Sequence, residues 1–301
     1  MLVVYVSLLL IVIVGALYLA KAWRQAERAA AALVYPERKP IQMTPADFGI
    51  SSAETVHITV DGLTLSAWFI PPAPEKDGAT LLFVHGFSGN RASLLDVAAM
   101  LHKHGYGALL LDLRNHGESE GDITTWGYDE VDDVLAAFAY LQTRPEVNSE
   151  RIALFGKSMG GATVLRAAAH LPSARLIIAE SAYNDFGGNM PSITFNMGGL
   201  PRAYAPLVLR AAERQTGVPL REVRPLDDIP RLAARPLLFI HGTADQLVAP
   251  SHSEAMFAAA TEPKLLYLVP GAAHVGVFAA DPTGYETAVI PFIDQYLSGN
   301  P

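Results

Sequence analysis

The order of apolar and polar positions predicts a sheet of buried strands that alternate with helices. Six short runs are almost wholly apolar: Leu81–Val84, Ala108–Leu111, Ile152–Phe155, Leu176–Ala179, Leu237–Ile240 and Leu265–Val269. Continuous apolar runs are typical of strands covered on both faces. Helix-like segments separate these runs or follow them: Ala92–His104, Tyr128–Gln142, Met159–His170, Ser251–Ala260 and Tyr285–Leu297. The alternation predicts an α/β protein with a mostly parallel central sheet and helices on both faces.

A hairpin is expected ahead of this sheet. Val56, Ile58 and Val60 alternate with polar residues, Asp61-Gly62 is typical of a tight turn, and apolar positions alternate again over 63–69. Two alternating strands around an Asp-Gly turn predict a leading antiparallel pair.

One interval, residues 182–235, contains no clear strand. Its 54 residues are too many for a structureless loop in a compact domain. A helical run over about 202–215 and several glycines and prolines predict a small helical insertion over the sheet edge, which we interpret as a lid. The alternative is an irregular surface excursion without function.

The N-terminus predicts a membrane anchor. Residues 2–20 carry no side-chain charge, and nineteen helical residues extend about 28 Å, close to the thickness of a bilayer core. A cleaved signal peptide or a buried core helix are the alternatives. No basic segment precedes the apolar run, and the run is long for a signal peptide. We therefore expect an anchor over 1–21, a linker over 22–50 and one domain over 51–301, with residues 21–40 forming a short helix that Pro36 and Pro40 end.

The charges have two consequences. Lys21 and Arg24 follow the apolar run directly, so the positive-inside tendency would keep the domain cytoplasmic. The net charge of −8 argues against a nucleic-acid partner.

With half of its 301 residues hydrophobic, the chain can build a large core. It contains no cysteine, so it has neither disulfides nor a thiolate nucleophile.

The strongest chemical signal is the segment Gly156-Lys157-Ser158-Met159-Gly160-Gly161. It lies between an apolar run and a helix, and G-x-S-x-G at such a junction presents a nucleophilic serine on a sharp, strained turn. Side chains two residues away on either side would collide, which explains Gly156 and Gly160. Ser158 is the candidate nucleophile.

Three further loops follow apolar runs and supply the remaining candidates. His85-Gly86-Phe87-Ser88-Gly89 would place the Phe87 amide, together with the Met159 amide, in an oxyanion hole. Asp245, after the run ending at Ile240, is the candidate acid, and His274 is the candidate base. Glu180 and Asp185 are alternatives for the acid. His85 and His241 are expected to be structural.

These motifs resemble those of the α/β-hydrolase superfamily over about Glu54–Leu297. The segment Asp112-Leu113-Arg114-Asn115-His116-Gly117-Glu118-Ser119 is similar to a loop common in such hydrolases, where Asp112 and Arg114 would hold loops together. The anchor more weakly resembles membrane-tethered ABHD-like members. The resemblance implies the α/β-hydrolase fold and two-step acyl transfer through Ser158, without metal or organic cofactor.

Three functions stay open at this point. The first is cleavage of carboxylic esters, including lipid esters and thioesters, for which the anchor and the apolar residues of 182–235 suggest a lipid-like substrate. The second is a serine peptidase on the same fold. The third is a non-catalytic, membrane-tethered interaction module. The sequence predicts no oligomeric state.

Overall fold

The computed structural model describes residues 2–274 and 276–298, and its centre is a sheet of eight strands in the order β1-β2-β4-β3-β5-β6-β7-β8. The strands are β1 (Glu54–Val60), β2 (Leu63–Ile70), β3 (Thr80–Val84), β4 (Gly107–Leu111), β5 (Ile152–Lys157), β6 (Leu176–Glu180), β7 (Leu237–Gly242) and β8 (Lys264–Val269). β1 pairs with β2 and β2 with β4 in antiparallel register, and all other pairs are parallel. The predicted mixed sheet with a leading hairpin is confirmed.

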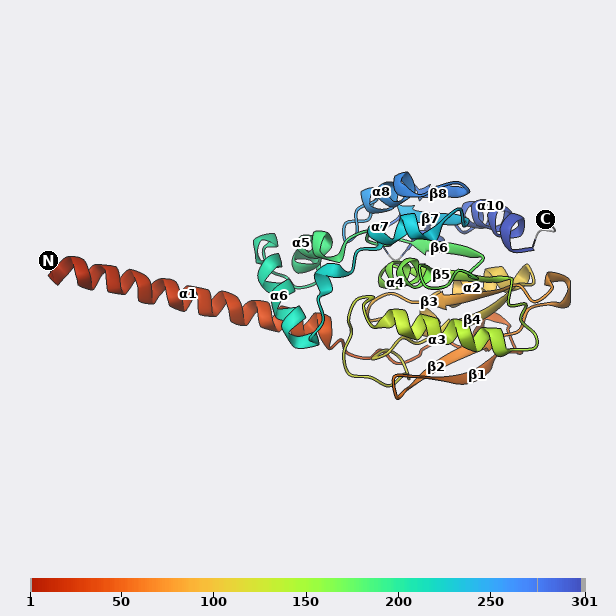
Figure 1. The fold of residues 1–301 in the computed structure, drawn as a ribbon, viewed down its shortest axis with the longest axis horizontal. Helices are drawn as coiled ribbons and strands as arrows, with labels where there is room; N and C mark the ends of the chain where they lie inside the picture. Colours follow the sequence, from red (N-terminus) through yellow and green to blue (C-terminus); the bar gives the residue numbers. More distant parts are fainter. Residues whose placement is uncertain (1, 275, 299–301) are drawn as a thin grey trace.

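Helices cover both faces of the sheet (Figure 1). On one face pack α3 (Glu130–Thr143), α4 (Met159–Ala168) and α8 (Ser251–Ala259); on the other pack α2 (Leu95–Lys103) and α10 (Pro282–Ile293). We call the core under α3, α4 and α8 the first core and the core under α2 and α10 the second. Successive strand residues point to opposite faces, so Leu82 and Val84 lie in the first core and Leu81 and Phe83 in the second. Because both faces are covered, the middle of each parallel strand is apolar, and polar residues such as Thr80, Lys157 and Glu180 lie at strand ends.

The insertion between β6 and β7 is helical. It contains α5 (Phe186–Asn196), α6 (Ala205–Thr216) and α7 (Pro225–Asp228). Outside the insertion, a short helix, α9 (Val277–Ala280), lies between β8 and α10. The sequence predicted α6 but not α5, whose Gly187, Gly188 and Pro191 are unusual in a helix. The Asp185 carboxylate caps α5 by accepting a hydrogen bond from the Gly188 amide, at 3.0 Å.

The N-terminal apolar segment belongs to a single long helix, α1 (Leu2–Val34), that projects from the domain (Figure 1). Among the described residues it is the one helix long and apolar enough to cross a membrane, and a signal sequence would pass the same test. The helix continues without a break beyond the apolar run. Its last turns are buried against the domain through Ala26, Ala30 and Leu33, with α6 as the principal neighbour.

Candidate active site

The turn between β5 and α4 holds Ser158 in a strained conformation. Its φ of 56° and ψ of −119° lie where residues other than glycine are uncommon. A Cβ on Gly156 would lie 2.2 Å from the Gly160 carbonyl oxygen, and one on Gly160 would lie 2.1 Å from the Val84 carbonyl oxygen. The chain passes so closely at this turn that only glycine fits at both positions.

A chain of hydrogen bonds runs from Ser158 through His274 to Asp245. The Ser158 Oγ and the His274 Nε2 are 2.8 Å apart, and the His274 Nδ1 and the Asp245 Oδ2 are 2.6 Å apart. The buried Asp245 carboxylate can only accept a hydrogen bond, so the Nδ1 of a neutral His274 carries the proton and donates it. The Nε2 is then unprotonated and can accept the proton of the Ser158 hydroxyl. The three residues come from three loops, and Ser158 and His274 are 116 positions apart in the chain; the sheet brings them to one edge.

The surroundings of Asp245 keep it ionised. Its Oδ1 accepts hydrogen bonds from the amides of Leu247 and Val248, both at 2.9 Å, and the His241 Nε2 lies 3.2 Å from Oδ2. Burial raises the pKa of the Asp245 carboxyl, but the hydrogen bonds from His241, His274 and the Val248 amide outweigh this and hold the pKa well below its usual range. A permanently charged acid can fix the tautomer of His274 and stabilise its protonated form.

His241 therefore supports the acid. Its Nε2 also lies 2.9 Å from the Val248 carbonyl, an acceptor, so the proton is on Nε2, and Nδ1 accepts from the Ser253 hydroxyl at 2.7 Å.

The loop after β3 carries Phe87 next to the serine. A Cβ on Gly86 would lie 3.1 Å from the Ser158 Cβ, so this loop passes directly beside Ser158. Within the described residues the Phe87 amide donates no hydrogen bond, and Met159, as the first residue of α4, has no intrahelical acceptor for its own amide. Two unpaired N–H groups thus flank Ser158.

Two neutral histidines fix this loop. The His85 Nε2 accepts from the Leu113 amide and its Nδ1 donates to the Gly86 carbonyl, at 3.1 and 2.7 Å. The His116 Nε2 accepts from the Ser88 amide at 3.1 Å. Burial lowers the pKa of His85 to about 4, and burial together with the nearby His85 lowers the pKa of His116 to about 4. Both are uncharged braces at neutral pH.

The two alternative acids have other partners. The Glu180 Oε1 lies 3.1 Å from the Lys157 Nζ, and Oε2 accepts from the Tyr285 hydroxyl at 2.8 Å. Burial disfavours the Lys157 ammonium, but the Glu180 carboxylate outweighs this and raises the pKa of Lys157. Asp185 caps α5, as described above. Neither carboxylate is hydrogen-bonded to His274.

A cavity of about 300 Å³ opens beside Ser158 and His274. Phe87, in the loop after β3, lines one wall together with Trp126 and Tyr183. Apolar side chains of the insertion and of the loop that carries Asp245 line another: Ile193, Met197, Leu247 and Val248. Lys39, which follows α1 in the chain, lies at its rim. No group of three metal-ligating side chains gathers anywhere in residues 2–274 and 276–298.

Comparison with known proteins agrees with this architecture. Residues 75–217 match the family described as serine aminopeptidase S33, a segment that includes Ser158 but ends before Asp245 and His274. An esterase of Pyrococcus furiosus superimposes with a TM-score of 0.73 at 25% identity, over 88% of this chain and 98% of that one.

Two curated relatives cover most of the chain. YfhR of Salmonella typhimurium is 33% identical over 273 residues, 89% of this chain and 88% of its own. The α/β-hydrolase domain-containing protein WAV2 of Arabidopsis thaliana is 27% identical over 86% of this chain and 83% of its own. The chain belongs to the α/β-hydrolase superfamily. This membership confirms the predicted α/β-hydrolase fold and, with the similarity to the Pyrococcus furiosus esterase, supports a hydrolase.

Within this α/β-hydrolase the structure brings together all five residues predicted from sequence: Ser158, Asp245, His274, Phe87 and Met159. Their chemical roles stay predictions. Sequence reasoning missed the contribution of Trp126, because it lies in a loop outside any recognised motif. The four-residue spacing of His241 and Asp245 was visible, but nothing in it indicated that the histidine would contact the acid.

Proposed function

We propose that this α/β-hydrolase is a serine hydrolase that cleaves carboxylic esters through an acyl-enzyme on Ser158. The observation that carries the proposal is the continuous hydrogen-bonded chain Ser158–His274–Asp245 at the mouth of an apolar cavity. Proximity of nucleophile, base and ionised acid is the arrangement that acyl transfer requires.

The proposed reaction has two steps, and the observed distances support the first. The Ser158 hydroxyl attacks the ester carbonyl carbon while its proton passes to the His274 Nε2, and Asp245 stabilises the imidazolium. The oxyanion binds the Phe87 and Met159 amides. His274 then protonates the departing alkoxide and an acyl-enzyme remains. A water molecule, deprotonated by His274, attacks this ester, and the acid leaves as Ser158 recovers its proton.

The substrate we propose is a lipid-like ester or thioester. The cavity wall formed by Ile193, Met197, Leu247 and Val248 suits an acyl chain. The cavity also lies near the end of α1, since Lys39 is at its rim and a Cβ on Gly198, just after α5, would lie 3.5 Å from the Ala29 Cβ. A site held this close to an anchor could take its substrate from the bilayer.

We further propose that α1 is a retained single-pass anchor with the domain on the cytoplasmic side. The helix continues from its apolar part into buried turns of the domain, so cleavage near residue 20 would interrupt one continuous helix. Lys21 and Arg24 at the boundary favour the cytoplasmic orientation.

A fluorophosphonate probe tests the nucleophile. We expect labelling of the wild-type chain that disappears in Ser158→Ala, and release of p-nitrophenol from acyl esters with a preference for medium or long chains. A folded wild-type chain that is neither labelled nor active on any ester would contradict the proposal and point to the interaction module.

A serine peptidase is the second candidate, favoured by the match of residues 75–217 to a family described as serine aminopeptidase. A panel of aminoacyl p-nitroanilides beside the esters separates the two. Turnover of the anilides with kcat/KM above that of the esters would replace the esterase proposal by the peptidase.

A further inference from the structure

The end of α1 is joined directly to the wall of the candidate site. The last carbonyls of a helix have no intrahelical partner, and here they are satisfied by the loop before α3. The Trp126 indole N–H donates to the Leu33 carbonyl at 3.0 Å, and the Thr124 amide donates to the Val34 carbonyl at 2.9 Å. α1 therefore ends on the loop that contains Trp126.

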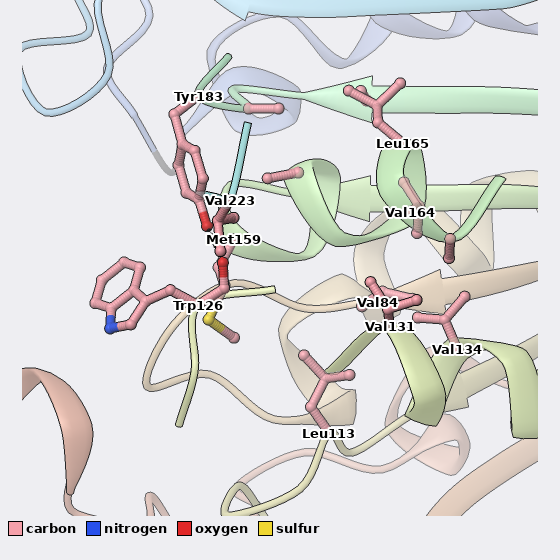
Figure 2. Packing of buried hydrophobic residues seen from close by; sticks show 14 of the residues in the cluster. Val84, Leu113, Trp126, Val131, Val134, Met159, Val164, Leu165, Tyr183 and Val223 are labelled. Carbon is pink, nitrogen blue, oxygen red and sulfur yellow. Dashed lines mark hydrogen bonds between the residues drawn. The ribbon is translucent and has the colours of Figure 1, made fainter. Parts of the chain in front are cut away.

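The same tryptophan stacks on the loop beside the serine. The rings of Trp126 and Phe87 lie 4.3 Å apart with an angle of 16° between their planes. Trp126 lines the cavity and is only 3% exposed. It lies with Tyr183 at one end of the first core (Figure 2), and the Tyr183 hydroxyl donates to the Trp126 carbonyl. One side chain thus connects the N-terminal helix to the residue whose amide flanks Ser158.

The backbone of Trp126 has an unfavourable conformation that hydrogen bonds from neighbouring residues hold in place. Its φ of 57° is uncommon for a bulky side chain. The Glu130 carboxylate accepts hydrogen bonds from the amides of Thr125 and Gly127, both at 2.7 Å, and so fixes the backbone on either side. With the backbone held there and the carbonyl held by Tyr183, the indole N–H bond to Leu33 sets the orientation of the ring.

From these contacts we infer that Trp126 is a positioning residue through which α1 sets the place of the Phe87 amide. The N-terminal helix is then part of the catalytic support as well as an anchor. The inference rests on the proposed function, since it assumes that the Phe87 amide binds the oxyanion. Loosening α1 or removing the indole N–H would weaken transition-state stabilisation while the cavity itself still binds substrate.

Two substitutions in the full chain test this from opposite sides. Trp126→Phe keeps an aromatic ring against Phe87 but loses the bond to Leu33, and Leu33→Ala removes a buried contact of α1. Each should lower kcat on a p-nitrophenyl ester by about tenfold and leave KM within about twofold, since a misplaced oxyanion donor acts mainly on the transition state.

Matched controls are Trp68→Phe and Leu101→Ala, both buried in the core on the other face of the sheet. They should destabilise the fold comparably, as read by thermal unfolding, without lowering kcat. The double variant Trp126→Phe/Leu33→Ala should lose little more than either single variant, because Trp126→Phe removes the donor and Leu33→Ala displaces the turn of α1 that carries the accepting carbonyl of the same bond. An unchanged kcat in Trp126→Phe, an equal loss in the controls, or a fully additive double loss would each overturn the inference.

The proposed function fails separately. If the wild-type chain is not labelled by fluorophosphonate at Ser158, the esterase proposal falls before the variants are compared. If the wild type is labelled and active and Trp126→Phe matches its kcat, the coupling to α1 alone is refuted.

Discussion

Replacing Asp245 by asparagine should remove nearly all turnover while leaving the fold intact. The Oδ1 of Asp245 accepts from the amides of Leu247 and Val248, and an asparagine retains these bonds by placing its carbonyl oxygen there. Its NH₂ group then takes the place of Oδ2, 2.6 Å from the His274 Nδ1 and 3.2 Å from the His241 Nε2, which keeps its bond to the Val248 carbonyl. Since two donors cannot face each other, Nδ1 becomes an acceptor and the imidazole proton moves to Nε2, where it blocks transfer from Ser158.

The expected loss in kcat at neutral pH is about 10⁴-fold, the size of the effect when a triad histidine is held in the wrong tautomer. This corresponds to about 5 kcal/mol of transition-state stabilisation. The assay is steady-state hydrolysis of a p-nitrophenyl ester, with circular dichroism to show that the variant folds.

The matched control is Glu180→Gln, which alters a buried carboxylate that pairs with Lys157 and not with His274. We expect its kcat to stay within about tenfold of the wild type, with lower thermal stability because a buried cation loses its counter-charge. Turnover that survives in Asp245→Asn and vanishes in Glu180→Gln would show that the acid has been assigned wrongly.

Three further predictions concern stability and the membrane. Gly160→Ala should destabilise the fold by about 3 kcal/mol or more, because its Cβ would meet the Val84 carbonyl oxygen at 2.1 Å; Gly15→Ala, which meets nothing within 4 Å, should not, and equal urea midpoints would refute the argument. Burial lowers the pKa of His85 to about 4, and burial and His85 do the same for His116, so the unfolded chain binds more protons between about pH 6.5 and 4. The histidine contribution to stability should be complete above this window and fall as the pH drops through it, by about 4 kcal/mol between pH 7.5 and pH 5, and the buried Asp133, whose pKa burial raises to about 6, should offset about 1 kcal/mol of this loss; a urea midpoint independent of pH over that range would contradict it. The full chain should stay in the membrane pellet after an alkaline carbonate wash and keep its first 20 residues by intact mass, whereas a mature form that lacks them would identify a signal peptide.

The fold and the turn that holds Ser158 could be predicted because their causes are local. Continuous apolar runs follow from burial on both faces, and the glycines flanking Ser158 follow from a turn that leaves no room for a Cβ. The order of Ser158, Asp245 and His274 along the chain also sufficed to place them at one edge, because parallel strands end together.

What sequence could not give depends on contacts between distant segments. The sequence predicts a short helical linker after the apolar run, and α1 does continue to Val34, but the packing of these turns against the domain is not predicted. Its buried turns consist largely of alanine, and such a pattern does not reveal that α6 provides the matching surface. The contacts of Trp126 could not be predicted for the same reason: its stacking on Phe87 and its hydrogen bond to the Leu33 carbonyl join residues far apart in the chain, and no sequence pattern indicates them.

The boundaries of two helices differ from prediction for local reasons. The helix expected from Tyr128 begins at Glu130, whose carboxylate is engaged by the preceding backbone amides. The helix expected from Ala92 begins as a tight turn over Arg91–Leu94, capped by the Asn90 side chain, before α2.

Trapping the acyl-enzyme tests the central claim most directly. The full chain is mixed with a slowly hydrolysed p-nitrophenyl ester, quenched in acid within seconds, digested and examined by mass spectrometry. We predict one acyl group on the peptide containing Ser158, with a burst of p-nitrophenol equal to the enzyme concentration. Steady turnover with no burst and no acylated peptide, or acylation at another residue that Ser158→Ala leaves unchanged, would contradict the account.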